Sequence, residues 1–126
     1  MRKLLLAVLL CFAGAAQAEW ILWDDGGGTR LFVDLDTKKT VNGKSRIWVM
    51  YDTDTANDVG WLSIKILQEA NCTQGQSRQL SWVSYKGHKG TGEVGATSDN
   101  SPGAWSYPAP GTFGETTFIL LCGKNH

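Results

Sequence analysis

Histidine and cysteine, the residues that most often serve catalysis and metal binding, are scarce in this chain. Its 126 residues include two histidines, His88 and the terminal His126, and three cysteines. No nucleophile motif places a serine or cysteine beside a general base, so we predict that the protein is not an enzyme. Thiols without a nearby pair of histidines make a poor zinc site, and no metal or cofactor is predicted.

An excess of either charge is absent as well, because twelve basic side chains balance twelve acidic ones. Proteins that bind nucleic acid or anionic membranes usually carry excess positive charge, so neither partner is predicted. Only three prolines occur, and 42% of the residues are hydrophobic. This length and composition are typical of one small folded domain.

A hydrophobic run long enough to cross a bilayer is also missing. Arg2 and Lys3 precede an apolar run over residues 4–13, and the small-residue pattern Ala16-Gln17-Ala18 follows. The run has roughly ten residues, against the ~20 that a spanning helix needs, so it indicates a secretory signal peptide and no transmembrane segment. We expect residues 1–18 to be removed before Glu19. The exported domain, residues 19–126, would then reside in the periplasm or at the cell surface.

The three cysteines then have different roles. Cys11 lies in the signal peptide, where lipid attachment is an alternative that the bulky preceding residue Leu10 disfavours. The exported domain keeps only Cys72 and Cys122. Because exported proteins meet an oxidising compartment, these two are predicted to form a disulfide.

Alternating apolar and polar residues predict β-strands through most of the domain. In the stretch 61–85, Leu62, Ile64 and Ile66 alternate with residues assigned to the opposite face, among them Trp61. The turn-forming residues around Cys72 divide this stretch into a hairpin. Further strands are predicted in a first hairpin over 20–34, in an apolar central strand over 46–51 and in a weak strand over 93–97.

The segments between these strands are predicted to be solvated. Residues 36–43 are interpreted as a polar connector, and residues 52–58 as a solvated loop whose acidic spacing fails the EF-hand pattern. Residues 85–92 form a basic, glycine-rich loop. His88 in this loop is expected to be solvated, since a lone loop histidine seldom binds a metal.

A short buried helix is predicted over residues 113–122. Thr112 and Glu115 have the spacing of a capping box, and Gly123 suits the end of a helix. The disulfide would join the end of this helix to the sheet. The predicted fold class is therefore α+β, with a single antiparallel sheet of about six strands and a C-terminal helix packed on one face and tethered by a disulfide.

With this arrangement the chain resembles the surface-adhesin protein E family of Gram-negative bacteria over nearly the whole of residues 19–126. The resemblance rests on the order and spacing of Arg46-Ile47-Trp48, Tyr51, Ser63-Ile64-Lys65, Glu69, Cys72, Arg78, Ser84-Tyr85, Trp105, Pro110-Gly111-Thr112, Glu115 and Cys122. It implies the same sheet with a disulfide-tethered helix. It also implies adhesion to host extracellular-matrix glycoproteins.

The resemblance places the family's ligand-binding region at residues 76–90 of this chain. Here a partner protein would contact Arg78, Tyr85, Lys86 and Lys89. Because these are few cations, we expect only modest electrostatic attraction. A periplasmic inhibitor or an envelope structural protein without an adhesive role fits the same size, export signal and disulfide. The oligomeric state is left open, with a dimer among the options.

Overall fold

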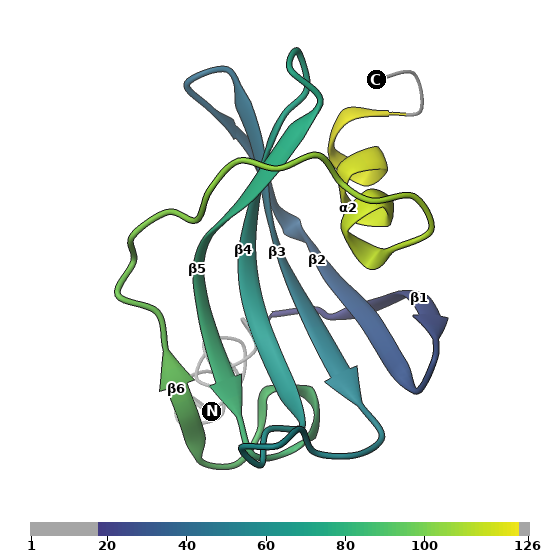
Figure 1. Cartoon of the computed structure of the whole chain (residues 1–126), viewed down its shortest axis with the longest axis vertical. Coiled ribbons are helices and arrows are strands. Elements are labelled where there is room, and N and C mark those ends of the chain that lie inside the picture. The colour runs from purple at the N-terminus through teal and green to yellow at the C-terminus, as the bar shows by residue number, and fades with distance from the viewer. Residues whose placement is uncertain (1–17, 124–126) are drawn as a thin grey trace, which may run out of the picture.

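A computed structural model of the protein describes residues 18–123 (Figure 1). The predicted signal peptide, apart from Ala18, lies outside the described residues. The lipidation alternative at Cys11 lies outside them as well.

The described chain forms one antiparallel sheet of six strands, in which each strand pairs with its neighbours in sequence. The strands are β1 (Ile21–Gly26), β2 (Thr29–Val41), β3 (Lys44–Thr53), β4 (Ser63–Asn71), β5 (Gln76–Tyr85) and β6 (Val94–Thr97). This meander confirms the predicted sheet, with its hairpins and its weak last strand. It also places β3 and β4 in the centre, as the apolar character of residues 46–51 predicted.

The predicted polar connector over residues 36–43 is wrong, because most of it is strand. β2 continues to Val41, with an irregularity in its pairing to β3 between Asp34 and Lys39. Val41 pairs with Lys44 across a two-residue turn in which Asn42 and Gly43 have positive φ angles of 52° and 78°. Such a turn matches the twist of the two strands that it joins, so polar residues here form an exposed hairpin.

The main hydrophobic core lies between the sheet and the helix α2 (Phe113–Cys122). Leu31, Val49 and Ile66 of the sheet meet Phe118 and Leu121 of the helix. The helix begins as predicted, because the Thr112 side chain accepts a hydrogen bond from the Glu115 backbone N–H. Its start is therefore set by the capping residue, and its position on the sheet by the buried pair Phe118 and Leu121.

A disulfide joins this helix to the sheet. Cys72, in the turn between β4 and β5, is bonded to Cys122 in the last turn of α2, with 5.5 Å between their Cα atoms. This bond confirms the predicted pairing. It also fixes the last turn of α2 beside the upper end of the sheet in Figure 1.

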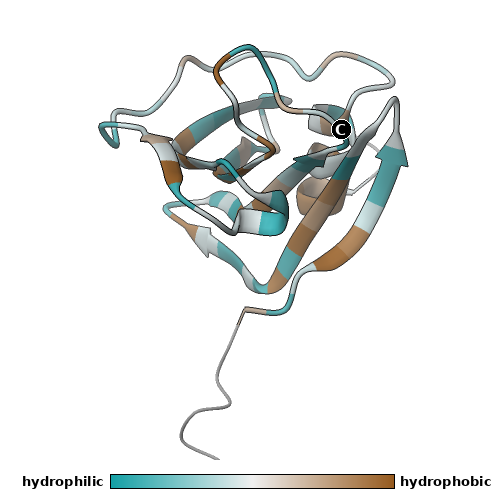
Figure 2. Ribbon diagram, turned by 90° about the horizontal axis from the view of Figure 1, so that it is seen from below, coloured by the Kyte–Doolittle hydropathy of each residue, from teal (hydrophilic) through white to brown (hydrophobic). Residues whose placement is uncertain are grey.

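The opposite face of the sheet is buried in part as well. Phe32 and Met50 are buried apolar residues of this face, and the polar residues Asp52, Ser63 and Glu69 are buried there as well. Figure 2 shows hydrophobic and hydrophilic residues alternating along the strands, as expected for a sheet with two different faces. A short helical turn, η1 (His88–Gly90), contacts β3 and β4.

The predicted position of Trp61, away from Ile64, is wrong. Trp61 precedes β4. The centre of its ring lies 5.8 Å from the centre of the Trp82 ring, and Trp82 packs against the helix-side core. The Asn57 side chain accepts hydrogen bonds from the backbone N–H groups of Val59 and Trp61. This turn redirects the chain before the strand begins, so the alternation of β4 does not extend back to Trp61.

Candidate protein-binding surface

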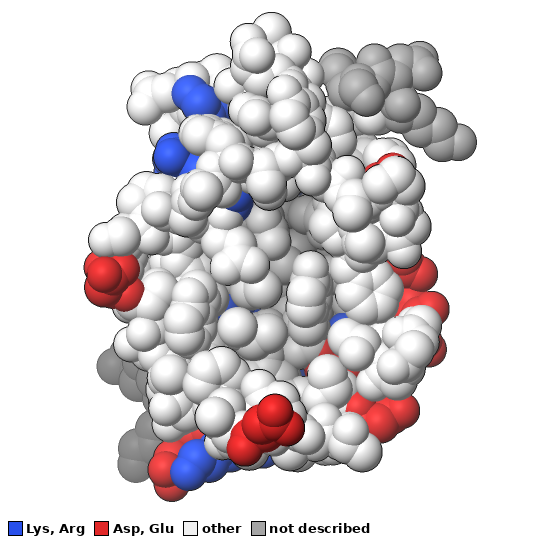
Figure 3. Space-filling model, in the orientation of Figure 1, with Lys and Arg blue, Asp and Glu red and all other residues white. Residues whose placement is uncertain are grey.

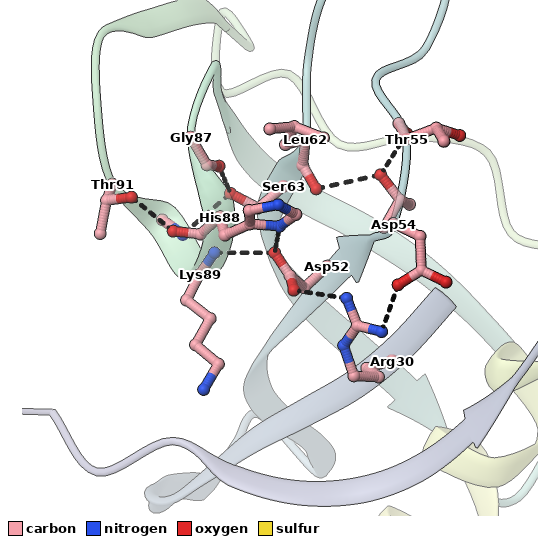
Figure 4. A network of polar contacts seen from close by, with 12 residues as sticks. Arg30, Asp52, Asp54, Thr55, Leu62, Ser63, Gly87, His88, Lys89 and Thr91 are labelled. Carbon is pink, nitrogen blue, oxygen red and sulfur yellow. Dashed lines mark hydrogen bonds and ion pairs between the residues drawn. The ribbon is translucent and has the colours of Figure 1, made fainter. Parts of the chain in front are cut away.

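The basic loop between β5 and β6 is attached to the sheet by one buried carboxylate. Asp52, at the end of β3, accepts hydrogen bonds from the Lys89 backbone N–H at 2.8 Å and from Arg30 at 2.9 Å. His88 Nδ1 lies 3.1 Å from Oδ1, the same carboxylate oxygen that accepts from Lys89, whereas Arg30 donates to Oδ2 (Figure 4). Three donors from two distant segments thus meet at a single side chain.

This contact corrects the expectation for Asp52 and adds a partner to that for His88. Asp52 was assigned to a solvated loop, but it is 2% exposed, whereas residues 54–58 are exposed as predicted. The side chain of His88 is 52% exposed, in line with the expectation, yet it pairs with Asp52. The reason is that Asp52 continues the alternation of β3 and points to the face that the loop covers.

The contacts of Asp52 favour its charged form. Burial by itself raises the pKa of a carboxyl group, but the hydrogen bonds from Lys89, Arg30 and His88 outweigh it and hold the pKa of Asp52 below its ordinary value. Arg30 also donates to Asp54 at 2.7 Å, and these two carboxylates raise the pKa of its guanidinium. The site is therefore an ion-paired anchor at neutral pH.

A second buried side chain attaches the same loop. The Ser63 hydroxyl donates to the Gly87 carbonyl at 2.7 Å and accepts from the Gly90 backbone N–H at 2.8 Å. Gly90 has a φ of 70°, a backbone conformation that favours glycine over residues with a Cβ. Both ends of η1 are thereby fixed to β4.

Three of the four predicted partner-binding residues lie together at this end of the sheet. Tyr85 ends β5, and the exposed Lys86 and Lys89 follow in the attached loop. Lys86 forms an exposed ion pair with Glu93 at 3.2 Å, and the Lys89 ammonium lies 5.2 Å from the centre of the Phe32 ring. We call Tyr85, Lys86 and Lys89 the basic-loop surface.

A third cation, Lys65, which was not among the predicted partner-binding residues, joins this surface. The Lys65 ammonium lies 5.1 Å from the centre of the Tyr85 ring and 5.6 Å from that of Trp20. Lys65 follows Ser63 by two residues in β4, so the period of the strand places both on the face that the loop covers. The strand alternation was the signal that could have identified it.

Arg78, the fourth predicted residue, lies near the other end of β5. Its guanidinium is 2.8 Å from Glu69, which also pairs with Arg46 at 2.7 Å, and it stacks 4.3 Å from the centre of the Trp105 ring. Burial raises the pKa of Glu69, but the two arginines outweigh it and lower that pKa. The structure thus separates Arg78 from the basic-loop surface and pairs its charge within the fold.

Two further features bear on the kind of function. In the part of the chain that the structure describes, no three His, Cys, Asp or Glu side chains gather as a metal site. Within residues 18–123, no helix has the length and apolar character needed to cross a membrane. The arrangement of the basic-loop surface suits non-covalent recognition by cations, an aromatic ring and backbone groups.

Comparison with known proteins identifies the family. The profile of surface-adhesin protein E matches residues 20–123. The chain belongs to the surface-adhesin protein E family. This is a family of bacterial surface adhesins, which is consistent with export, and it is not known for enzymatic activity. A search of curated proteins found no match.

Solved structures of protein E from Haemophilus influenzae share the fold of this family member. Crystal form II is 14% identical in sequence, with a TM-score of 0.59, and the match covers 83% of this chain and 94% of that one. The protein from non-typeable Haemophilus influenzae is 13% identical, with a TM-score of 0.59, and the match covers 85% and 77% of the two chains. Both likenesses concern the fold.

Proposed function

We propose that this protein is an exported adhesin of the bacterial envelope that binds a protein partner through the basic-loop surface, with host extracellular-matrix glycoproteins as the candidate partners. Family membership supports binding to host proteins. The observation that carries the proposal is the attachment of the loop by Asp52 and Ser63, which leaves Lys86 and Lys89 exposed on a preorganised backbone. Preorganisation reduces the entropy lost when a loop binds.

In this proposal the four residues have two kinds of role. Tyr85, Lys86 and Lys89 would contact the partner, because tyrosine is enriched in protein interfaces and exposed cations at a rim steer a partner of opposite charge. Arg78 would act indirectly. Its pairing with Glu69 and its stacking on Trp105 position the segment that runs beside β5.

The test uses charge reversal. Replacing Lys86 and Lys89 by glutamate should weaken binding of the exported protein to immobilised matrix glycoproteins, and the loss should be larger at about 0.05 M than at about 0.5 M salt, because salt screens exposed charges. The matched control is Lys38→Glu with Lys39→Glu, which changes the net charge equally on the exposed β2–β3 hairpin. Both double variants should unfold within a few degrees of the original protein.

The outcomes separate the competing functions. Saturable binding that both double variants keep would move the contact site elsewhere. No binding at either salt concentration, together with fractionation of the protein to the periplasm, would favour a periplasmic inhibitor or an envelope structural protein. An intact mass beginning at Glu19 without lipid would agree with the proposed export, whereas a species beginning at acylated Cys11 would identify a lipid-anchored protein.

A further inference from the structure

A groove crosses the helix side of the sheet where α2 leaves the strands uncovered. One cavity of about 210 Å³ lies beside Trp61 and Ile64. A second cavity, of about 420 Å³, lies between the start of α2 and the crossing segment 103–109, and Tyr51 lines both cavities. Figure 3 views this side and shows charged residues mainly at the rim and a largely uncharged, recessed centre. We call the two cavities together the helix-side groove.

A buried amide lies in the floor of this groove. Gln68 lies on β4 between Ile66 and Ala70, two positions that the core buries completely or nearly so, and it is itself only 9% exposed. Among residues 18–123, no group forms a hydrogen bond with its side chain, and no side-chain polar atom in this part of the protein is both fully enclosed and unpaired. The Gln68 amide therefore opens into the groove. A polar group in such a position requires a partner there.

Residues with hydroxyl groups also line the groove, beside apolar residues such as Leu62 and Ile64. The Tyr51 hydroxyl forms no hydrogen bond with any described residue, and burial raises its pKa, which keeps it a neutral donor and acceptor. The hydroxyls of Thr29 and Thr55 line the smaller cavity and also have no partner within residues 18–123. Each of these groups can both donate and accept, as can the Gln68 amide.

The walls add aromatic surface without free charge. Trp61 lines the smaller cavity, and the centre of its ring lies 5.8 Å from that of the Trp82 ring, which packs against it. The one ionic side chain among the lining residues is Arg78, whose charge is paired with Glu69. An ionic ligand would find no free counter-charge, and a purely alkyl ligand would leave the amide and the hydroxyls unpaired.

We propose that the helix-side groove binds a neutral saccharide. A sugar ring has apolar C–H faces that pack on an aromatic ring, whose face is electron-rich, and hydroxyl groups that donate and accept at its edge. Gln68 and Tyr51 would bind hydroxyls at the floor, and Trp61 would carry the ring. This site lies on the side of the sheet opposite the basic-loop surface, so it is a second, separate binding function.

An extended peptide is disfavoured as the ligand, because the strand edge beside the groove is already covered. Peptides that bind a sheet usually pair with a free strand edge. The edge of β5 beside the groove is already used, since Ser77 forms a β-bridge with Ser106 and the Gly103 N–H donates to the Gln79 carbonyl at 2.7 Å. The groups that remain free in the groove are side-chain amides and hydroxyls.

Two substitutions test the groove without disturbing the core. Gln68→Leu keeps the volume and removes the amide. Gly114 lines the larger cavity, and a Cβ built there meets only the Thr112 hydroxyl, at 3.6 Å, so Gly114→Leu would fill the groove from the first turn of α2. Gly114→Ala is the matched control, since it adds a methyl group and leaves the groove open.

The probes are neutral trisaccharides of glucose, of galactose and of N-acetylglucosamine, titrated into the full exported protein. Binding is followed by tryptophan fluorescence and by the shift of the Trp61 indole N–H signal in NMR spectra. We expect saturable binding of at least one trisaccharide, a loss of about tenfold or more in affinity for Gln68→Leu and Gly114→Leu, and affinity within about twofold for Gly114→Ala. The Lys86 and Lys89 double variant should bind the sugar unchanged.

Circular dichroism and the unfolding midpoint establish that each variant is folded before it is titrated. No binding of any of the three trisaccharides would overturn the proposal. It would be overturned equally by binding that survives both Gln68→Leu and Gly114→Leu.

Discussion

Asp52 accepts hydrogen bonds from the Lys89 backbone and Arg30 and pairs with His88, although these residues are far apart in sequence. Its own strand supplies no partner for its side chain. A carboxylate that is buried in this way is stabilised only while all its donors are in place. The position of the basic loop is therefore set by a residue that a binding partner would not touch.

Asp52→Asn is expected to lower the free energy of unfolding at pH 7 by about 1–3 kcal/mol, because a neutral amide pairs poorly with Arg30 and leaves buried donors unsatisfied. Urea unfolding measures this difference. Asp58→Asn is the matched control, since Asp58 is exposed and its side chain forms no hydrogen bond or ion pair with other described residues. Equal stability of the two variants would show that the anchor contributes nothing.

The effect of Asp52→Asn should depend on pH. The folded pKa of Asp52 is lowered from its ordinary value, so its stabilisation is fully present above an unfolded pKa of about 3.9 and is lost as the pH falls through the folded pKa. The difference in unfolding midpoint between the original protein and Asp52→Asn should therefore shrink from about pH 5 downwards. A difference that is constant down to about pH 2 would contradict the assigned charge state.

At the scale of the element, β6 is a short edge strand whose Gly95 packs against the Trp61 ring. A Cβ at Gly95 would lie 2.4 Å from Nε1 of Trp61 and 2.9 Å from the Ser84 hydroxyl. The strand can thus approach the Trp61 ring only because this residue has no side chain. Trp61 in turn closes one wall of the helix-side groove.

Gly95→Ala is accordingly expected to displace β6 or Trp61 and to destabilise the protein by about 1–3 kcal/mol, the usual cost of overpacking. Urea unfolding, with the Trp61 indole signal in NMR spectra, measures both effects. The control is Gly114→Ala in the first turn of α2, where the added methyl has room and should leave the stability equal or slightly higher. A Gly95→Ala variant as stable as the original would refute the close contact.

Elements that depend on local patterns were predictable from the sequence. The capping box at Thr112 and Glu115 located α2, and period-two alternation located the central hairpin. Predictions failed where the deciding contact is distant in sequence. The strand character of residues 39–41 depends on pairing with β3, and the burial of Asp52 depends on Lys89. The basic-loop surface was predictable as a segment, but the separation of Arg78 from it required the register of β5.

At the scale of the whole molecule, the two faces of one sheet carry two different surfaces. α2 and the disulfide cover the upper part of one face and leave the uncharged helix-side groove below and beside them. The basic loop covers the lower part of the other face and presents its lysines. The proposed protein partner and the proposed saccharide would therefore bind without competing.

The Cys72–Cys122 disulfide is the single covalent bond, within the described residues, that ties α2 to this sheet, and it spans a sequence separation of 50 residues. The chain-entropy model gives about 4 kcal/mol for closing such a loop, so replacing both cysteines by serine should lower the free energy of unfolding by about 2–5 kcal/mol. Phe118 and Leu121 still pack on the sheet in that variant. We therefore expect it to fold, with faster amide hydrogen exchange in the last turn of α2 and little change in β3 and β4.

The disulfide itself is tested in the original protein. Alkylation of the denatured, unreduced protein should label neither cysteine. Labelling of both, or a double serine variant of unchanged stability and exchange, would show that the helix is held by packing alone.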